Sequence, residues 1–403
     1  MAVAVGRRGR RYPRVWSAAS LVAAVLSATV LSACSTSGGG APAATTAAPA
    51  LAAVPLTDSS ATSAGTWATV AMGHLNDRLN TFWQMFHLAA GSTHWTLKTP
   101  PGVATSGGLI SSTGPSGSFT VGFGPSTFLH FSPLTQSTDQ GATWPARGIL
   151  PGALALGPDS LATSSDHRYL ALLTRSGGEV VASGGDLSTW TKVAGAGSVA
   201  ATPSLSGCGI EGLTAVAFQS NREEIIGGSC GRGSAAGVFA LRGGTWQSVG
   251  PSLPASAPGP TRVIRLLGTP TGATALISAG SGASGQLFAA QSVDGLSSWS
   301  LSAPLPQSGG TLVSTSVTAA GTFAAVTKSP SGALSAAVTN SSGTTWQPLP
   351  PLPARTVVVA TDPGGTSYAV IEAPDIVQFD ALGAAGWGQV QTLNVSIPYG
   401  SSG

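Results

Sequence analysis

Tryptophan recurs along this chain at a nearly constant interval, and this is the feature that most constrains the fold. The spacings between successive members of the series are 49, 46, 56, 53, 47 and 41 residues. The series consists of Trp95, Trp144, Trp190, Trp246, Trp299, Trp346 and Trp387. A period of about 40 to 55 residues matches one four-stranded unit of a circular β repeat. Chance recurrence of tryptophan in an ordinary β protein is the alternative.

The segments before each tryptophan consist of short apolar runs separated by turns rich in Gly and Ser. Before Trp246, for example, such runs cover residues 213–218, 223–228 and 238–242. This composition predicts β-strands, and no long segment after residue 62 shows the 3.6-residue period of a helix. We therefore expect an all-β domain over residues 63–403. A seven-bladed β-propeller fits the repeat, with six or eight blades as the nearest alternatives.

One tryptophan follows a complete turn motif. Residues 137–144 read STDQGATW, which has the pattern S-x-D-x-G-x-T-W. Ser and Asp side chains bond turn amides, and Gly adopts backbone conformations that other residues resist. The motif resembles the Asp box (BNR repeat) of sialidase-like propellers, which joins the third and fourth strands of a blade. The resemblance implies structural roles for Ser137, Asp139, Gly141 and Trp144.

The first and last units are the least regular. Only two strands, at residues 67–72 and 82–88, are expected before Trp95, whereas the runs 389–393 and 395–399 both follow the last tryptophan. We expect the C-terminal run to supply the missing innermost strand of the first unit. Closure of the ring in this way would remove exposed sheet edges.

The first 33 residues have the organisation of an export signal. Five arginines and no acidic residue occur within the first 14 residues, and an apolar segment rich in Ala, Val and Leu follows over residues 15–33. A basic region followed by an apolar region is typical of a signal peptide. The apolar segment is about long enough to span a membrane, so an uncleaved membrane helix is the alternative.

Cys34 directly follows the apolar segment. The sequence Leu31-Ser32-Ala33-Cys34 resembles the lipobox of bacterial lipoproteins. In that family the signal is cut before the cysteine, and the sulfur carries a diacylglycerol whose buried CH₂ groups each contribute about 0.8 kcal/mol of anchoring. The resemblance implies a lipid anchor at Cys34 on the extracytoplasmic face of the cell membrane. Plain secretion is the alternative, and the general secretory and twin-arginine routes both stay open.

Residues 35–62 are dominated by Ser, Thr, Gly, Ala and Pro and carry almost no charge. This composition is typical of a flexible linker. The expected organisation is a signal peptide at 1–33, a lipidated cysteine and linker at 34–62, and the propeller at 63–403.

Charge and cysteine content limit the partners and the compartment. Five of the 18 Lys and Arg residues lie in the signal, which contains none of the 15 Asp and Glu residues, so the remaining chain has 13 basic and 15 acidic side chains. This balance argues against a nucleic-acid partner. With Cys34 lipidated, Cys208 and Cys230 remain, and a cysteine pair in an exported protein predicts a disulfide bond. Two free thiols are the alternative.

The densest cluster of polar residues is GHLNDRLN at residues 73–80, between the two strands expected before Trp95. Because the first unit lacks its innermost strand, these two are its second and third strands. Turns between second and third strands share a face with the blade-to-blade connections, and propellers usually bind ligands on that face. The expected closing strand brings Tyr399 to the same place. The candidate ligand-binding residues are His74, Asn76, Asp77, Arg78, Asn80 and Tyr399. A polar loop that caps itself is the alternative.

The resemblance to sialidases raises the alternative of a diverged glycoside hydrolase. Sialidases use three arginines and a Tyr–Glu pair, whereas Arg78 is the only arginine between the signal and the first Asp box. The sequence also nominates no carboxylate pair and no metal-ligand spacing, so we expect no cofactor and no metal. The favoured function is a membrane-anchored binding or scaffolding module, monomeric, with glycans or envelope proteins as partners.

Overall fold

The computed structural model describes residues 57–73, 81–100, 109–113, 118–123, 134–145, 154, 157–174, 178–185, 187–202, 207–219, 222–232, 234–307, 310–340, 342–373 and 375–395. All of them belong to the unit Ala48–Gly403. Within these ranges no helix has the length and apolar character needed to cross a membrane.

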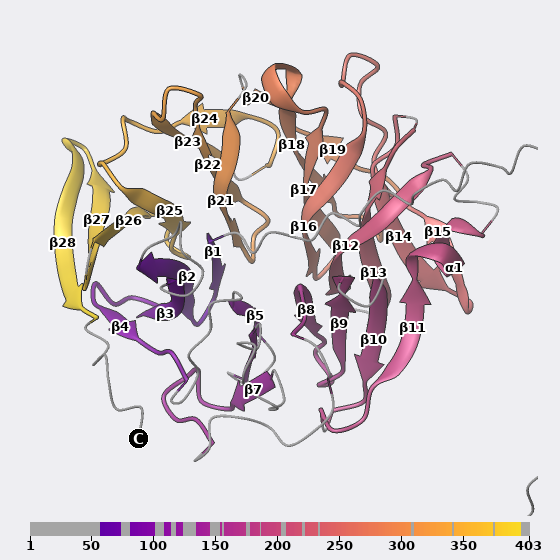
Figure 1. Ribbon diagram of the computed structural model, residues 1–403, viewed down its shortest axis with the longest axis horizontal. Coiled ribbons are helices and arrows are strands. Elements are labelled where there is room, and N and C mark those ends of the chain that lie inside the picture. Colours follow the sequence, from indigo (N-terminus) through magenta and orange to yellow (C-terminus); the bar gives the residue numbers. More distant parts are fainter. Residues whose placement is uncertain are drawn as a thin grey trace, which may run out of the picture. The chain divides into compact units, whose positions relative to one another are not determined.

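Antiparallel strands follow one another in meanders, and each meander runs from an inner strand to an outer strand (Figure 1). In chain order, with semicolons between meanders, the strands are β1 (Thr57–Thr62), β2 (Gly65–Gly73), β3 (Thr81–Ala89), β4 (Trp95–Leu97); β5 (Leu109–Thr113), β6 (Phe119–Phe123), β7 (Leu134–Ser137); β8 (Ser160–Thr163), β9 (Tyr169–Leu173), β10 (Glu179–Ser183), β11 (Thr191–Gly195); β12 (Ile210–Phe218), β13 (Glu224–Cys230), β14 (Gly237–Arg242), β15 (Thr245–Ser248); β16 (Thr261–Thr269), β17 (Gly272–Ala279), β18 (Gln286–Ser292), β19 (Ser300–Leu301), β20 (Leu305–Pro306); β21 (Thr311–Thr318), β22 (Phe323–Lys328), β23 (Leu334–Thr339), β24 (Trp346–Pro348); and β25 (Thr356–Thr361), β26 (Ser367–Ala373), β27 (Ile376–Gly383), β28 (Gly386–Asn394). Among the residues that the structure describes, the short helical segments α1 (Ala196–Ala200) and the 3-10 turn η4 (Gly282–Ser284) lie between strands.

Burial along the strands explains their composition. All five residues of β9 are buried, because the second strand of a meander has a neighbouring meander on each face. The outer strand β15 buries only Trp246. Apolar, β-branched and small residues suit strands that are buried on both faces, which accounts for the low share of charged residues, 8% of the chain.

Each tryptophan of the periodic series belongs to a hydrophobic core between two successive meanders. Trp190 packs with residues of β7 to β10, and Trp246 packs with residues of β8 to β14. The other tryptophans take equivalent places. Trp144 lies between the first and second meanders, and Trp299 lies between the fourth and fifth. Trp346 lies between the fifth and sixth meanders, and Trp387 lies between the sixth and the last. The repeat therefore marks the side chain that joins one meander to the preceding one.

The last meander packs against the first through a core of the same kind, which again contains a tryptophan of the periodic series. Trp95 of β4 shares a core with Phe86 of β3 and with Val370 and Phe379 of β26 and β27. Gln391 of β28 also accepts a hydrogen bond from the Trp95 N–H at 2.7 Å and donates one to the Trp95 carbonyl at 2.9 Å. The meanders thus form a closed series, which is the arrangement of a β-propeller.

The strand that completes the first meander is β1, and the expectation that residues 395–399 supply it is wrong. Ala61 of β1 pairs antiparallel with Thr66 of β2 and parallel with Thr318 of β21. Since β1 and β3 occupy both edges of β2, no position is left there for a C-terminal strand. The strand also lies within residues 34–62, the predicted linker. Its sequence, TDSSAT, has no apolar alternation, but backbone pairing on both edges holds it in the sheet.

Hydrogen bonds also join some meanders into larger sheets. Ser229 and Cys230 of β13 pair with Arg262 and Thr261 of β16, and β1 links the first meander to β21. The all-β prediction is confirmed. The count of seven blades stays a prediction, because the hydrogen-bonded sheets do not coincide with single meanders.

Candidate functional site

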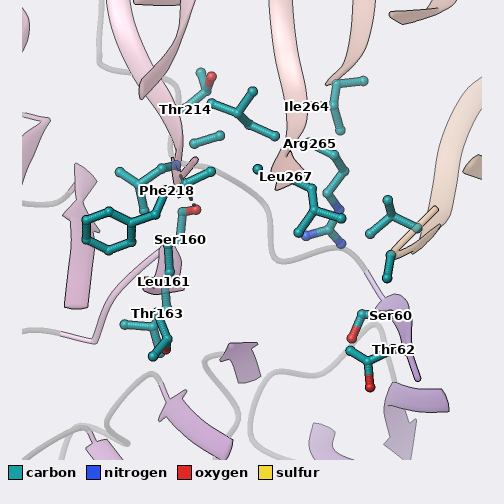
Figure 2. Close-up of a pocket in the computed structure, with 18 of the residues that line it drawn as sticks. Ser60, Thr62, Ser160, Leu161, Thr163, Thr214, Phe218, Ile264, Arg265 and Leu267 are labelled. Atoms are coloured by element: carbon teal, nitrogen blue, oxygen red, sulfur yellow. Dashed lines mark hydrogen bonds between the residues drawn. The ribbon is translucent and has the colours of Figure 1, made fainter. Parts of the chain in front are cut away.

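A cavity of about 320 Å³ lies among the inner strands. Its walls are formed by β1, β8, β12, β16 and β21, which are first strands of five meanders (Figure 2). The volume falls at the lower end of the range of about 300 to 1,000 Å³ found for small-molecule sites. We call it the inner-strand cavity.

A backbone bulge recurs at equivalent points in the inner strands. The register shifts at Thr214 in β12, at Ile264 in β16 and at Val313 in β21. A bulge adds one residue to a strand and redirects the side chains around it. Thr214 and Ile264 both line the cavity. Arg265 of β16 and Ala215 of β12 are each the first residue after the bulge. Aligning the two strands at the bulge therefore places these residues at the same level along the inner strands.

Arg265 brings a positive charge to the cavity wall. Its Nε donates a hydrogen bond to Thr315 Oγ1 of β21 at 2.7 Å. Figure 2 shows the guanidinium directed toward the part of the cavity that Ser60 and Thr62 bound. The side chain is therefore held by a neighbouring meander while its head lies at the cavity.

Asp159 brings a carboxylate to the opposite side of β12. Its Oδ2 accepts hydrogen bonds from the Thr174 N–H at 2.7 Å and from the Thr174 hydroxyl at 2.6 Å. The next residue, Ser160, accepts a hydrogen bond from the Val216 N–H of β12 at 3.1 Å. Ser160 is therefore level with Val216, and Asp159 is level with Ala215 and Arg265. Two opposite charges stand at one height on two walls of the cavity.

The rest of the lining is apolar or hydroxylated. Thr62 Oγ1 accepts a hydrogen bond from the Ala64 N–H at 3.2 Å, so this hydroxyl, like that of Ser160, is positioned by the backbone. The apolar lining includes Leu161, Val216, Leu267 and Val317. Such a wall can hold an aliphatic group and orient a few polar atoms.

A charged cluster borders the cavity beside Phe218, which lines it. The guanidinium of Arg168 lies 5.2 Å from the centre of the Phe218 ring, a cation–π distance. Arg168 Nη1 is 3.7 Å from Glu224 Oε1, and Arg222 Nε is 3.3 Å from Asp166 Oδ2. This cluster ties the β8–β9 turn to the β12–β13 turn.

The two carboxylates of this cluster have opposite pKa shifts. The Ser164 hydroxyl, with help from the charges of Arg168 and Arg222, lowers the pKa of Asp166. Burial raises the pKa of Glu224, against the attraction of Arg168. Asp166 is therefore the firmly ionised partner, whereas the charge on Glu224 is costly in its surroundings.

The structure contains the expected disulfide bond between Cys208 and Cys230, whose Cα atoms are 4.9 Å apart. Cys208 precedes β12, and Ile210 of β12 pairs with Cys230 at the end of β13. Both cysteines are buried in the core between the third and fourth meanders. The bond therefore links the connection between the third and fourth meanders to strand β13 of the fourth meander.

The Asp box forms the turn after β7. Ser137 Oγ accepts the N–H of Gly141 at 2.8 Å, and Asp139 Oδ1 accepts the N–H of Thr143 at 2.8 Å. The Thr143 hydroxyl is the largest of several hydrogen-bonding causes that lower the pKa of Asp139 to about 2. Gly141 has φ of 72°, and a Cβ there would lie 2.8 Å from the Trp67 ring. Each conspicuous residue of the motif thus has a structural role.

Two weaker copies form similar turns. Asp294 Oδ1 accepts the N–H groups of Ser297 and Ser298 at 3.1 and 2.9 Å. In the copy before Trp346, Asn340 Oδ1 accepts the N–H of Thr344 at 2.9 Å. An asparagine one position earlier than the usual Asp therefore replaces the carboxylate, a substitution that the motif pattern misses.

The predicted ligand-binding loop, with His74, Asn76, Asp77, Arg78 and Asn80, lies outside the described residues, as do Tyr399 and Cys34. The inner-strand cavity was not predicted from the sequence. Its lining includes Pro270 and Ala319, which follow first strands, so it reaches the face of the Asp boxes rather than the face expected to bind ligand. A possible signal was the pair Arg262 and Arg265 within an apolar strand.

The buried surroundings of Arg262 lower the pKa of its guanidinium, which underlines how unusual charge is on this strand. Within the described ranges no cluster of three or more His, Cys, Asp or Glu side chains is arranged to hold a metal ion. The chemistry offered by the inner-strand cavity is therefore that of a guanidinium, a carboxylate, hydroxyls and aliphatic groups.

The fold is that of known β-propeller proteins. The structure is similar to the periplasmic gluconolactonase of Pseudomonas aeruginosa (13% identity, 82% of this chain and 96% of that chain covered, TM-score 0.51). It is also similar to putative 6-phosphogluconolactonases from Bacteroides uniformis (11% identity, 82% and 97% covered, TM-score 0.50) and Bacteroides fragilis (9% identity, 82% and 96% covered, TM-score 0.50). At these identities the likeness concerns the fold alone. No protein-family model and no curated protein matches the chain.

Proposed function

We propose that this chain is a lipid-anchored, extracytoplasmic β-propeller of the sialidase-like (BNR) type that acts as a binding module and takes its ligand in the inner-strand cavity. The observation that carries the proposal is the cavity itself, about 320 Å³ in volume and lined by the first strands of five meanders. A concave, mostly apolar site with a few positioned polar groups is the usual form of a ligand site.

The lining favours binding over glycoside hydrolysis. Hydrolysis of a glycosidic bond uses two carboxyl groups about 5 to 9.5 Å apart. Among the described lining residues Asp159 is the one carboxylate, and Thr174 holds one of its oxygens with two hydrogen bonds. A single carboxylate held in this way can attract a cationic group of a ligand.

The extracytoplasmic location rests on three features. The lipobox-like Leu31-Ser32-Ala33-Cys34 follows a signal-like segment. The disulfide between Cys208 and Cys230 suits an oxidising compartment. A gluconolactonase with this fold is periplasmic. The anchor and linker would place the propeller in the envelope, where the loop at 73–80 is a second proposed contact surface, for glycans or envelope proteins.

The binding role can be tested with a variant that fills the cavity. Ser60 is half-buried on the cavity wall, so Ser60→Phe should occupy part of its volume. Ser248→Phe, on the exposed outer strand β15, is the matched control. Ligand-observed NMR against sugars, hydroxy acids, amino acids and dipeptides should show binding to the natural chain and the control but not to Ser60→Phe. Binding that persists in Ser60→Phe would exclude the cavity as the site.

The anchor is tested separately in cells. The natural chain should fractionate with membranes and partition into detergent, whereas Cys34→Ser should be released or remain unprocessed. Unchanged membrane association of Cys34→Ser would contradict lipid attachment. A pull-down from the envelope, comparing the natural chain with a His74→Ala, Asn76→Ala, Asp77→Ala triple variant, tests the loop. Equal capture of partners by both chains would exclude it as a contact surface.

A further inference from the structure

We propose that the inner-strand cavity binds a small organic cation, a primary amine with a short aliphatic body, and that its ammonium group lies at Asp159. This inference rests on the proposed function, because it names the ligand class of the same site. It comes from a difference between the two charged residues of the described lining. Arg265 is engaged within the chain, whereas Asp159 has no oppositely charged partner there.

The protein itself satisfies the guanidinium of Arg265. Its Nε donates a hydrogen bond to Thr315 Oγ1 of β21 at 2.7 Å, and Arg265 takes part in a further interaction within the chain. The cavity therefore does not require an anionic group from a ligand in order to compensate this side chain.

The carboxylate of Asp159 is held by uncharged groups alone. Its Oδ2 accepts hydrogen bonds from the N–H and the hydroxyl of Thr174, at 2.7 and 2.6 Å. Oδ1 accepts no hydrogen bond from the described residues, and none of the ion pairs that the structure shows among them includes Asp159. A carboxylate that is bonded on one oxygen and open on the other is suited to accept from an ammonium group.

The partly buried position of Asp159 strengthens this attraction. The residue lines the cavity and is only partly exposed. Opposite charges attract more strongly near a protein interior than in bulk water, and a charge removed from water without a partner is costly. An ammonium group at Oδ1 would supply the partner that the chain does not.

The strand register places this carboxylate opposite Arg265. The hydrogen bond from the Val216 N–H to Ser160 Oγ aligns β8 with β12, and the recurrent bulge aligns β12 with β16. Ser160, the neighbour of Asp159, lies across the cavity from Arg265 in Figure 2. Since a guanidinium offers a cation no attraction, the ammonium group belongs at the wall that Asp159 forms.

The remaining lining fits the carbon skeleton of an aliphatic amine. Leu161, Val216 and Leu267 offer apolar contacts. A volume of about 320 Å³ suits one small molecule rather than an extended polymer. The two hydrogen bonds from Thr174 hold the carboxylate in place before a ligand arrives, and preorganised groups lose little entropy on binding.

The test compares three probes that share one branched carbon skeleton and differ in the terminal group. They are 3-methylbutylamine, 3-methylbutan-1-ol and 3-methylbutanoate. Titration calorimetry with the full chain at pH 7 should show the amine binding at least about tenfold more tightly than the alcohol, because a charge-assisted hydrogen bond is roughly twice as strong as a neutral one. The acid should bind no more tightly than the alcohol. Absence of amine binding, or equal or tighter binding of the alcohol or the acid, would overturn the proposal.

A charge-neutral variant assigns the ammonium group to Asp159. Asp159→Asn keeps the shape of the side chain and an oxygen for Thr174, so it should remove most of the preference for the amine and leave the affinity for the alcohol unchanged. Asp375→Asn, at an exposed aspartate, is the matched control and should keep the preference. A full preference for the amine in Asp159→Asn would contradict the assignment. If this variant fails to fold, the comparison of probes on the natural chain still decides whether the cavity selects a cation.

The two proposals fail in different ways. If the alcohol binds as tightly as the amine, and Ser60→Phe abolishes the binding of both, the cavity is the ligand site but the cation assignment is wrong. If the amine binds the natural chain and Ser60→Phe equally well, the cavity is not the site and both proposals fall.

Discussion

The indole of Trp95 is stacked on the phenyl ring of Phe379, with ring centroids 4.6 Å apart and planes inclined by 10°. The two residues belong to the first and last meanders, and Tyr368 adds an edge contact at 5.6 Å. Gln391 completes this seam through its two hydrogen bonds to the backbone of Trp95. At this seam the first and last meanders are joined by packing and by side-chain hydrogen bonds, which include the one from Thr66 Oγ1 to the Thr361 carbonyl at 3.5 Å, while β1 occupies the inner position expected for the C-terminal strand.

Removal of the Gln391 amide should weaken the seam. Gln391→Ala leaves the N–H and carbonyl of Trp95 without these partners, and we expect a loss of about 1 to 3 kcal/mol in the free energy of unfolding. Gln389→Ala, on the exposed side of the same strand, is the control and should change it by less than about 0.5 kcal/mol. Urea denaturation measures both. Equal stability of the two variants would show that the amide does not hold the seam.

The inner strand β1 should be essential, whereas the last eight residues should not. Replacing Thr57–Thr62 with a proline-rich segment of equal length removes backbone N–H donors from the ladders to β2 and β21, so we expect an aggregated chain or one with a greatly lowered melting temperature. Deletion of residues 396–403 should leave the melting temperature nearly unchanged, because β1 already fills the inner position. Circular dichroism melts compare the two variants. A larger fall in melting temperature for the deletion than for the β1 replacement would instead support closure of the ring by the C-terminal strand.

His87 should make the fold sensitive to mild acid. It is only 6% exposed, and its ring lies 4.4 Å from that of Trp67. Burial, followed by the charge of Lys98, lowers its pKa to about 4 from 6.5. Below pH 6.5 the unfolded chain takes up the proton first, so stability is complete above pH 6.5 and is lost as pH falls toward 4. The linked loss is roughly 2 to 3 kcal/mol.

The variant His87→Phe keeps an aromatic ring beside Trp67 and cannot titrate. Its stability should fall less than that of the natural chain between pH 7 and pH 4, by the amount attributed to His87. Urea denaturation at several pH values measures the difference, and the acidic residues common to both chains cancel in the comparison. Parallel pH profiles would show that His87 is not protonated preferentially in the unfolded state.

Loss of the disulfide should destabilise the third and fourth meanders. Cys208 and Cys230 are separated by 22 residues, for which the loop-entropy model gives about 3 kcal/mol. The double variant Cys208→Ala, Cys230→Ala should lose about this amount in denaturation experiments. Mass spectrometry of the unreduced protein after alkylation should find neither cysteine modified. Two alkylated thiols would contradict the bond.

The sequence was sufficient for the features that depend on local chemistry and on regular repetition. The tryptophan series identifies the joints between meanders because every unit must bury the same kind of side chain against its neighbour. The Asp box could be assigned because Ser137 and Asp139 bond amides within a few residues of themselves. The disulfide could be expected because cysteines are few and the first 33 residues have the pattern of an export signal.

The tertiary structure alone decided which strand stands innermost and where a ligand can lie. β1 has a polar sequence, and its partners β2 and β21 are far apart in the chain, so no local pattern reveals it. Asp159, directly before β8, and Arg265 of β16 belong to different meanders and come to one level along the inner strands only through register and bulges. Local patterns report bonds within a segment, whereas a cavity among inner strands depends on how distant segments pack around it.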